Sequence, residues 1–155
     1  MYNNKQLENI HLLIVDGNEV DKQVMVPALE AEGAICHIVQ NRTEALGLYL
    51  TLFTDSIVPR AVITDWYINP PSTREFKFYK AINRPEANTS KALIERFRKL
   101  DEEVEIILYT SYVEYVDVED VPIVPKGSKM QVLIDAIKNS NAITKYFNMS
   151  NDVVR

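Results

Sequence analysis

The sequence has little cysteine and no long apolar segment. Its 155 residues include one cysteine, Cys36, and one tryptophan. A single cysteine excludes an intramolecular disulfide and a cysteine-based zinc cage, which favours a reducing compartment. The apolar runs are much shorter than a membrane-spanning helix requires, and the first residues lack a secretory apolar region. We therefore expect a soluble, cytoplasmic protein with no membrane partner.

The composition is that of an ordinary globular domain with an acidic surface. The formal net charge is −5, and 46% of the residues are hydrophobic. A chain of this length buries one sizeable core but is short for two domains. Because a net acidic surface opposes the phosphates of DNA and RNA, a nucleic-acid partner is not expected.

Short apolar segments alternate with amphipathic segments along the chain. We predict strands at 12–15, 35–39, 61–64, 104–109 and around 123–124, and helices at 20–32, 43–53, 90–100 and 130–137. Unbroken apolar runs suit strands that are covered on both faces in a parallel sheet. Right-handed crossovers between such strands build a doubly wound α/β fold with five strands.

One connection is much longer than the others. Residues 66–89 include Pro70, Pro71 and Pro85, and they exceed an ordinary connection between a strand and a helix. We expect a single domain over residues 1–145 with this long inserted loop, followed by a flexible tail at 146–155. Residues 74–80 interleave basic and aromatic side chains, which fits a loop packed onto the domain or a partner-binding surface.

Polar residues stand at the ends of the predicted strands. Asp16, Asp65 and Thr110 each end a strand, and Lys126 follows the last one. The carboxyl ends of parallel strands meet at one edge of a doubly wound sheet, so these residues should share a crevice. Paired carboxylates repel each other unless a cation lies between them, and oxygen ligands suit Mg²⁺. A hydroxyl and an ammonium group opposite them can hold phosphoryl oxygens. The plainer interpretation is that these residues only cap turns and helices.

The stretches around these residues resemble motifs of bacterial two-component response-regulator receiver domains. They are LIVDGNEV at 13–20, VITD at 62–65, ILYTS at 107–111 and VPK at 124–126, in order over roughly residues 10–140. The resemblance implies a flavodoxin-like sheet with strand order 2-1-3-4-5. It also implies a phosphoryl group received from a histidine kinase or a histidine phosphotransfer protein, and a signal passed on by protein contact. Such a domain is not an enzyme in the usual sense, because it catalyses at most its own phosphorylation and dephosphorylation.

The same resemblance implies a role for each residue at the strand ends. Asp65 would accept the phosphoryl group, Thr110 would move to bind it, and Lys126 would pair with it. The expected cofactor is Mg²⁺. Its implied ligands are Asp16, Asp65 and the backbone carbonyl of Tyr67, with Glu19 as a further candidate. A glutamate at a helix start also simply favours the helix dipole, which is the alternative for Glu19.

The sequence also departs from the receiver pattern. Gly17 stands where the family usually has a second acid, Gly127 stands where a proline usually follows the lysine, and Ile123 replaces a common aromatic residue. Thr110 follows Asp65 by 45 positions, which is more than the fold class normally uses, and precedes Lys126 by only 16. The second spacing leaves little room for a helix between the last two strands.

Two alternatives follow from these departures. A pseudo-receiver would keep the fold but signal through protein contacts without phosphorylation, and Gly17 and Ile123 favour it. A phosphatase would use Asp65 as a nucleophile on phosphate esters. That chemistry needs a general acid two residues further on, where Tyr67 stands, so we favour a stand-alone receiver over an enzyme.

Overall fold

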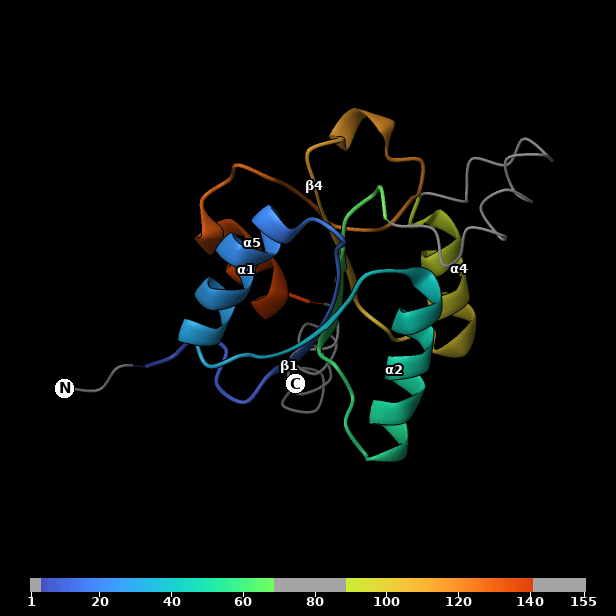
Figure 1. Cartoon of the computed structure of the whole chain (residues 1–155), viewed down its shortest axis with the longest axis horizontal. Coiled ribbons are helices and arrows are strands. Elements are labelled where there is room, and N and C mark those ends of the chain that lie inside the picture. The colour runs from blue at the N-terminus through green and yellow to red at the C-terminus, as the bar shows by residue number, and fades with distance from the viewer. Residues whose placement is uncertain (1–3, 69–88, 141–155) are drawn as a thin grey trace, which may run out of the picture.

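The computed structural model describes residues 4–68 and 89–140. Figure 1 shows its elements along the chain. They are β1 (His11–Val15), α1 (Glu19–Ala31), β2 (Ile35–Val39), α2 (Arg42–Thr54), β3 (Ala61–Thr64), α4 (Lys91–Leu100), β4 (Ile106–Thr110), the 3-10 turn η2 (Val113–Tyr115), β5 (Ile123–Pro125) and α5 (Met130–Lys138). The predicted strands and helices agree with these bounds to within two residues.

The five strands form one parallel sheet in the order β2-β1-β3-β4-β5, which confirms the predicted fold class and strand order. Val15 lies opposite Val39 on one side and opposite Thr64 on the other. The residues that follow Val15 and Thr64, Asp16 and Asp65, therefore leave the sheet side by side. This register sets the geometry of the site.

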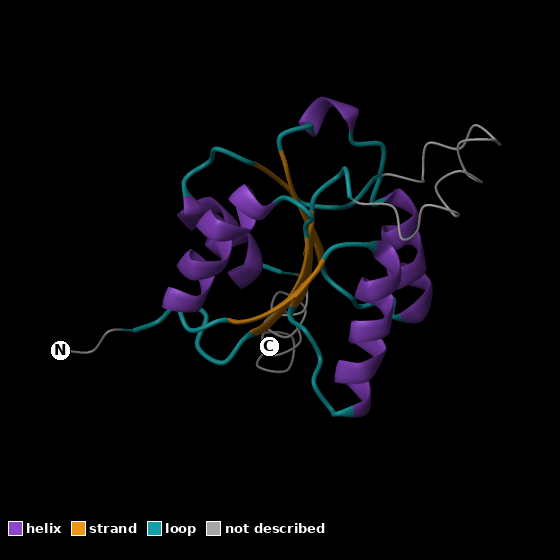
Figure 2. Cartoon of the chain, in the orientation of Figure 1, coloured by secondary structure: helices purple, strands orange, loops and turns teal. Residues whose placement is uncertain are grey.

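Helices cover both faces of the sheet, with α1 and α5 on one side and α2 and α4 on the other (Figures 1 and 2). Successive side chains of a strand point to opposite faces. In β1, Leu12 and Ile14 enter the core under α1 and α5, whereas Leu13 and Val15 enter the core under α2 and α4. All four are fully buried, which explains the unbroken apolar run in the sequence.

The connection between β4 and β5 contains only the short turn η2 and no α-helix over residues 111–122. Three valines, Val116, Val118 and Val121, pack against the core under α2 and α4 in place of a helix. The residues between them, Asp117, Glu119 and Asp120, are exposed. The short spacing between Thr110 and Lys126 therefore predicted this connection correctly.

Some predictions concern residues outside the described ranges. Most of the inserted loop, including the basic and aromatic residues 74–80, lies in 69–88, and the predicted tail at 146–155 lies in 141–155. Among the described residues, no helix has both the length and the apolar content to cross a membrane.

Candidate functional site

Two buried carboxylates stand at the carboxyl edge of the sheet. Asp16 is 3% exposed and Asp65 is 8% exposed. One oxygen of each is held by a nearby backbone amide: the Asn18 amide donates to Asp16 Oδ1 at 2.8 Å, and the Trp66 amide donates to Asp65 Oδ1 at 2.7 Å. The second oxygen of each carboxylate is left to interact with groups from other elements.

Lys126 supplies the positive charge between these carboxylates. Its backbone amide donates to the carbonyl of Thr110 at 3.0 Å, which extends the pairing of β4 and β5 by one residue. Its Nζ donates to Asp16 Oδ2 at 3.1 Å, to Asp65 Oδ2 at 2.6 Å and to Asp21 Oδ2 at 2.5 Å. These bonds match the three donors of an ammonium group. Three acids share one lysine, so the cluster keeps an excess of negative charge.

Asp21 is the member of this cluster that the sequence analysis missed. Asn18 caps α1, and its side chain accepts a hydrogen bond from the Asp21 amide at 3.1 Å. Asp21 therefore lies in the first helical turn, from which its carboxylate reaches Lys126. A capping residue followed by an acid three positions later, directly after an aspartate at a strand end, was the available signal.

Glu19, the candidate ligand named from the sequence, lies elsewhere. Its side chain is 70% exposed and bonds to Lys22 Nζ at 2.7 Å. Gly17 has no side chain to offer. The structure thus brings Asp21, rather than Glu19, to Asp16 and Asp65.

Thr110 and Tyr67 complete the edge. Thr110 ends β4 and is fully buried, and among the described residues its hydroxyl oxygen accepts a hydrogen bond from the Tyr112 amide at 3.1 Å. Tyr67 lies two residues after Asp65 and forms an isolated antiparallel bridge with Thr89. The predicted role of the Tyr67 carbonyl as a metal ligand stays a prediction.

Burial and ion pairing act in opposite directions on the charged groups. Burial raises the pKa of Asp16, although the Asn18 amide and Lys126 offset part of that effect. Burial alone would lower the pKa of Lys126, but hydrogen bonds to Asp21 and Asp65 outweigh it and raise that pKa above its usual range. Lys126 is therefore charged at neutral pH, and the cluster is held together by charge.

The cluster also suits a hard divalent cation. Asp16, Asp21 and Asp65 each offer a carboxylate oxygen, and the three oxygens lie within 4.8 Å of one another. Carboxylate oxygens are the ligands that Mg²⁺ prefers in proteins. The residues present therefore fit the cofactor that the sequence suggested, with Asp21 supplying a third carboxylate.

A doubly wound parallel sheet in the order β2-β1-β3-β4-β5, with three acids gathered at its carboxyl edge, places the chain among flavodoxin-like α/β domains. Within that class it has the fold of response-regulator receiver domains. The response regulator TrrA of Thermotoga maritima, solved with Mg²⁺ and beryllium fluoride, is 20% identical, with a TM-score of 0.62 over 83% of this chain and 96% of that chain. The magnesium-bound receiver domain of a sensor histidine kinase from Pseudomonas aeruginosa is 16% identical, with a TM-score of 0.62 over 84% and 95%.

A receiver domain protein from Clostridium thermocellum is similar in the same way, with 17% identity and a TM-score of 0.61 over 90% of this chain and 98% of that chain. No family model and no curated protein matches the sequence. At these identities the likeness lies in the fold. The function of this chain therefore depends on the residues of its own site.

Proposed function

We propose that the protein is a signal-transduction receiver that accepts a phosphoryl group on Asp65. The observation that carries this proposal is the position of Asp65 Oδ2, which lies 2.6 Å from Lys126 Nζ in a cluster of three acids, two of them buried. The other oxygen accepts a hydrogen bond from the Trp66 amide, so the backbone orients the carboxylate and its Oδ2 faces Lys126. An oriented carboxylate beside a buried cation suits a nucleophile for phosphoryl transfer.

The transfer forms a bond between Asp65 Oδ2 and phosphorus while the bond from phosphorus to the donor breaks. With a histidine kinase or a histidine phosphotransfer protein, the bond that breaks joins phosphorus to the imidazole nitrogen, which keeps the electron pair. Lys126 already contacts the attacking oxygen and pairs with the transferred group. The Thr110 hydroxyl, at the end of the neighbouring strand, donates to a phosphoryl oxygen.

Mg²⁺ is the proposed cofactor, held by Asp16, Asp21 and Asp65. When bound, it offsets the negative charge of the phosphoryl group. Asp21 provides the acid that Gly17 does not, from the first turn of α1 rather than from the strand end. Lys126 contacts one oxygen of each of these acids, so the ammonium group and the metal neutralise the same charge.

A histidine kinase or a histidine phosphotransfer protein is the proposed phosphodonor, and the cytoplasm is the proposed location. Support for the kinase comes from TrrA, which has also been solved in complex with the histidine kinase ThkA and which shares the fold of this chain at 19% identity and a TM-score of 0.59. The signal then passes to another protein by contact. No further enzymatic activity is proposed beyond self-phosphorylation and self-dephosphorylation.

Intact-mass measurement with acetyl phosphate and Mg²⁺ tests the proposal. We expect the wild-type chain to gain the mass of one phosphoryl group, and the Asp65→Asn variant to gain none. Asp55→Asn, which alters an exposed aspartate at the end of α2, serves as the matched control and should behave as wild type. A gain that persists in Asp65→Asn would show that another residue is the acceptor.

The second candidate is a pseudo-receiver that signals without phosphorylation. It is favoured by the contact of Lys126 with all three acids, which neutralises part of their charge without a metal. Trp66 adjoins Asp65, so its fluorescence should report Mg²⁺ and the phosphoryl mimic beryllium fluoride. If the fluorescence responds to neither and the mass stays unchanged, the pseudo-receiver is the correct description.

A further inference from the structure

Three exposed tyrosines lie beside the proposed phosphoryl site, where Tyr112 contacts both Tyr67 and Tyr115. We call them the tyrosine cluster. The rings of Tyr67 and Tyr112 are perpendicular with centroids 4.7 Å apart, and those of Tyr112 and Tyr115 are 6.3 Å apart. Their exposed fractions are 37%, 44% and 58% respectively. Tyrosine is enriched at the centres of protein interfaces, so a group of exposed rings is a candidate contact surface.

The segment that carries two of these rings is acidic. Residues 111–122 contain Glu114, Asp117, Glu119 and Asp120, all exposed, and no lysine or arginine. Interface potentials are complementary between partners. A partner for this surface should therefore present lysine or arginine side chains.

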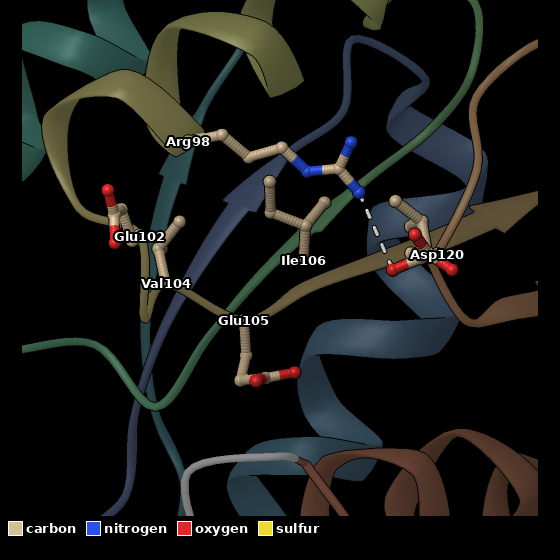
Figure 3. A pocket seen from close by; sticks show the side chains of 7 residues that line it. Arg98, Glu102, Val104, Glu105, Ile106 and Asp120 are labelled. Carbon is tan, nitrogen blue, oxygen red and sulfur yellow. Dashed lines mark hydrogen bonds between the residues drawn. The ribbon is translucent and has the colours of Figure 1, made fainter.

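The acidic segment is also tied to the domain, which makes it a shaped surface. Lys91 on α4 pairs with Asp117 at 3.1 Å. Arg98, further along α4, donates to the carbonyl oxygens of Glu119 at 2.7 Å and Asp120 at 3.5 Å, and Figure 3 shows this side chain reaching across to Asp120. The arginine thus binds the backbone of the segment and leaves the side chains of these two acids to solvent.

A short path joins the tyrosine cluster to the proposed site. Tyr67 follows Asp65 by two residues, and Tyr112 follows Thr110 by two residues. The Tyr112 amide donates to the Thr110 hydroxyl, the group proposed to bind the phosphoryl oxygens. When that hydroxyl turns toward a phosphoryl group, the Tyr112 backbone is either released or carried with it. Both movements change the contact between Tyr112 and Tyr67.

We propose that the tyrosine cluster is the docking surface for a protein segment that presents lysine or arginine side chains, and that Thr110 makes this surface respond to Asp65. The inference rests on the proposed function and adds the kind of partner and the route of the signal. Cationic side chains bind to the faces of tyrosine rings. In the present arrangement the perpendicular contact between Tyr67 and Tyr112 covers part of one ring. Phosphorylation uncovers it and strengthens docking.

Nuclear magnetic resonance of the full chain, with a tetra-arginine peptide as the probe, tests both parts. Beryllium fluoride with Mg²⁺ should shift the Trp66 indole signal and, through Thr110, the Tyr112 amide signal. The peptide should perturb the signals of the tyrosine cluster and bind about fivefold more tightly when beryllium fluoride is present.

Matched variants separate the contribution of the tyrosine ring to peptide binding from that of the acidic side chains. Tyr112→Ala should weaken peptide binding about fivefold, because one ring face is lost, whereas Tyr112→Phe should retain it. Glu114→Gln should weaken peptide binding. Glu30 is an exposed acid on α1, which lies on the opposite side of the sheet from α4, so Glu30→Gln should leave peptide binding unchanged.

Each contrary result has its own meaning. A Trp66 response without a Tyr112 response would overturn the link through Thr110 and leave the phosphoacceptor proposal intact. Absence of any Trp66 response would instead count against the proposed function, and the peptide titration of the resting protein would still test the surface. Peptide shifts centred away from the tyrosine cluster, or unchanged affinity in Tyr112→Ala, would overturn the docking surface.

Discussion

Two neighbouring parts of the sheet edge differ in what surrounds them. In the acid corner, formed by Asp16, Asp21, Asp65 and Lys126, the side chains of all but Asp21 are at most 10% exposed. In the tyrosine cluster every residue is at least 37% exposed and lies outside the sheet strands. Charges that act on a phosphoryl group are strongest where water is excluded, whereas a docking surface must be reachable. The difference therefore fits the two roles that we propose, phosphoryl transfer in the acid corner and partner docking at the tyrosine cluster.

Removing Lys126 tests the acid corner with the largest expected effect. Lys126→Met leaves three carboxylates without their common cation, so we expect the free energy of unfolding to fall by about 3 kcal/mol. Millimolar Mg²⁺ should restore part of it by binding the freed acids. Urea denaturation with and without Mg²⁺ measures both effects. Lys129→Met, at a lysine exposed on the surface, is the control, and an equal loss in both variants would contradict the role of Lys126.

The identity of the third acid is tested by Mg²⁺ affinity. Asp21→Asn removes one ligand charge, so we expect the Mg²⁺ affinity to fall about tenfold, whereas Glu19→Gln should leave it unchanged. Titration of the Trp66 fluorescence with Mg²⁺ measures both variants. If Glu19→Gln weakens binding and Asp21→Asn does not, the third metal ligand is Glu19 and Asp21 does not bind the metal.

The tyrosine cluster should contribute little to stability. Tyr112→Ala removes a half-exposed ring, and we expect the free energy of unfolding to change by less than about 1 kcal/mol. Phe97→Ala is the matched comparison, because Phe97 also makes a perpendicular ring contact, with Tyr49, but is fully buried. Its loss should cost about 3 to 5 kcal/mol. Thermal or urea denaturation of both variants measures the contrast, and similar losses would show that the cluster is structural.

A pH-dependent effect is expected at Cys36, on β2 and outside both regions. Burial raises its pKa from 9.0 to about 11. The unfolded chain loses the thiol proton first, so the contribution of Cys36 to stability is complete below pH 9 and declines as the pH rises toward 11. The difference in stability between wild type and Cys36→Ala should shrink over that range. A constant difference from pH 8 to pH 11 would contradict the raised pKa.

Much of the fold could be predicted from the sequence. Segments such as Leu12–Val15 are apolar throughout because both faces of the sheet are covered, and this pattern fixed their assignment as parallel strands. Asp16, Asp65 and Lys126 could be placed at one edge because parallel strands share their carboxyl ends. The short spacing between Thr110 and Lys126 likewise left little room for a helix there. Residue types and spacings close together in the sequence were sufficient for each of these predictions.

Asp21 and the tyrosine cluster could not be predicted in the same way. Both Glu19 and Asp21 lie in the first turn of α1, and the angle at which the helix leaves the strand decides which of them reaches Lys126. The side chains of Tyr67 and Tyr112 meet only because β3 and β4 are neighbours in the sheet. Their separation along the chain carries no signal of that contact.

By itself, the sequence determined the order of strands and helices and the edge at which the polar residues gather, because hydrophobic periodicity and strand ends are local properties. Only the tertiary structure decided that three acids share one lysine and that exposed rings meet beside Asp65. Those contacts depend on the register of parallel strands and the orientation of α1, which are set by packing between segments distant in the chain.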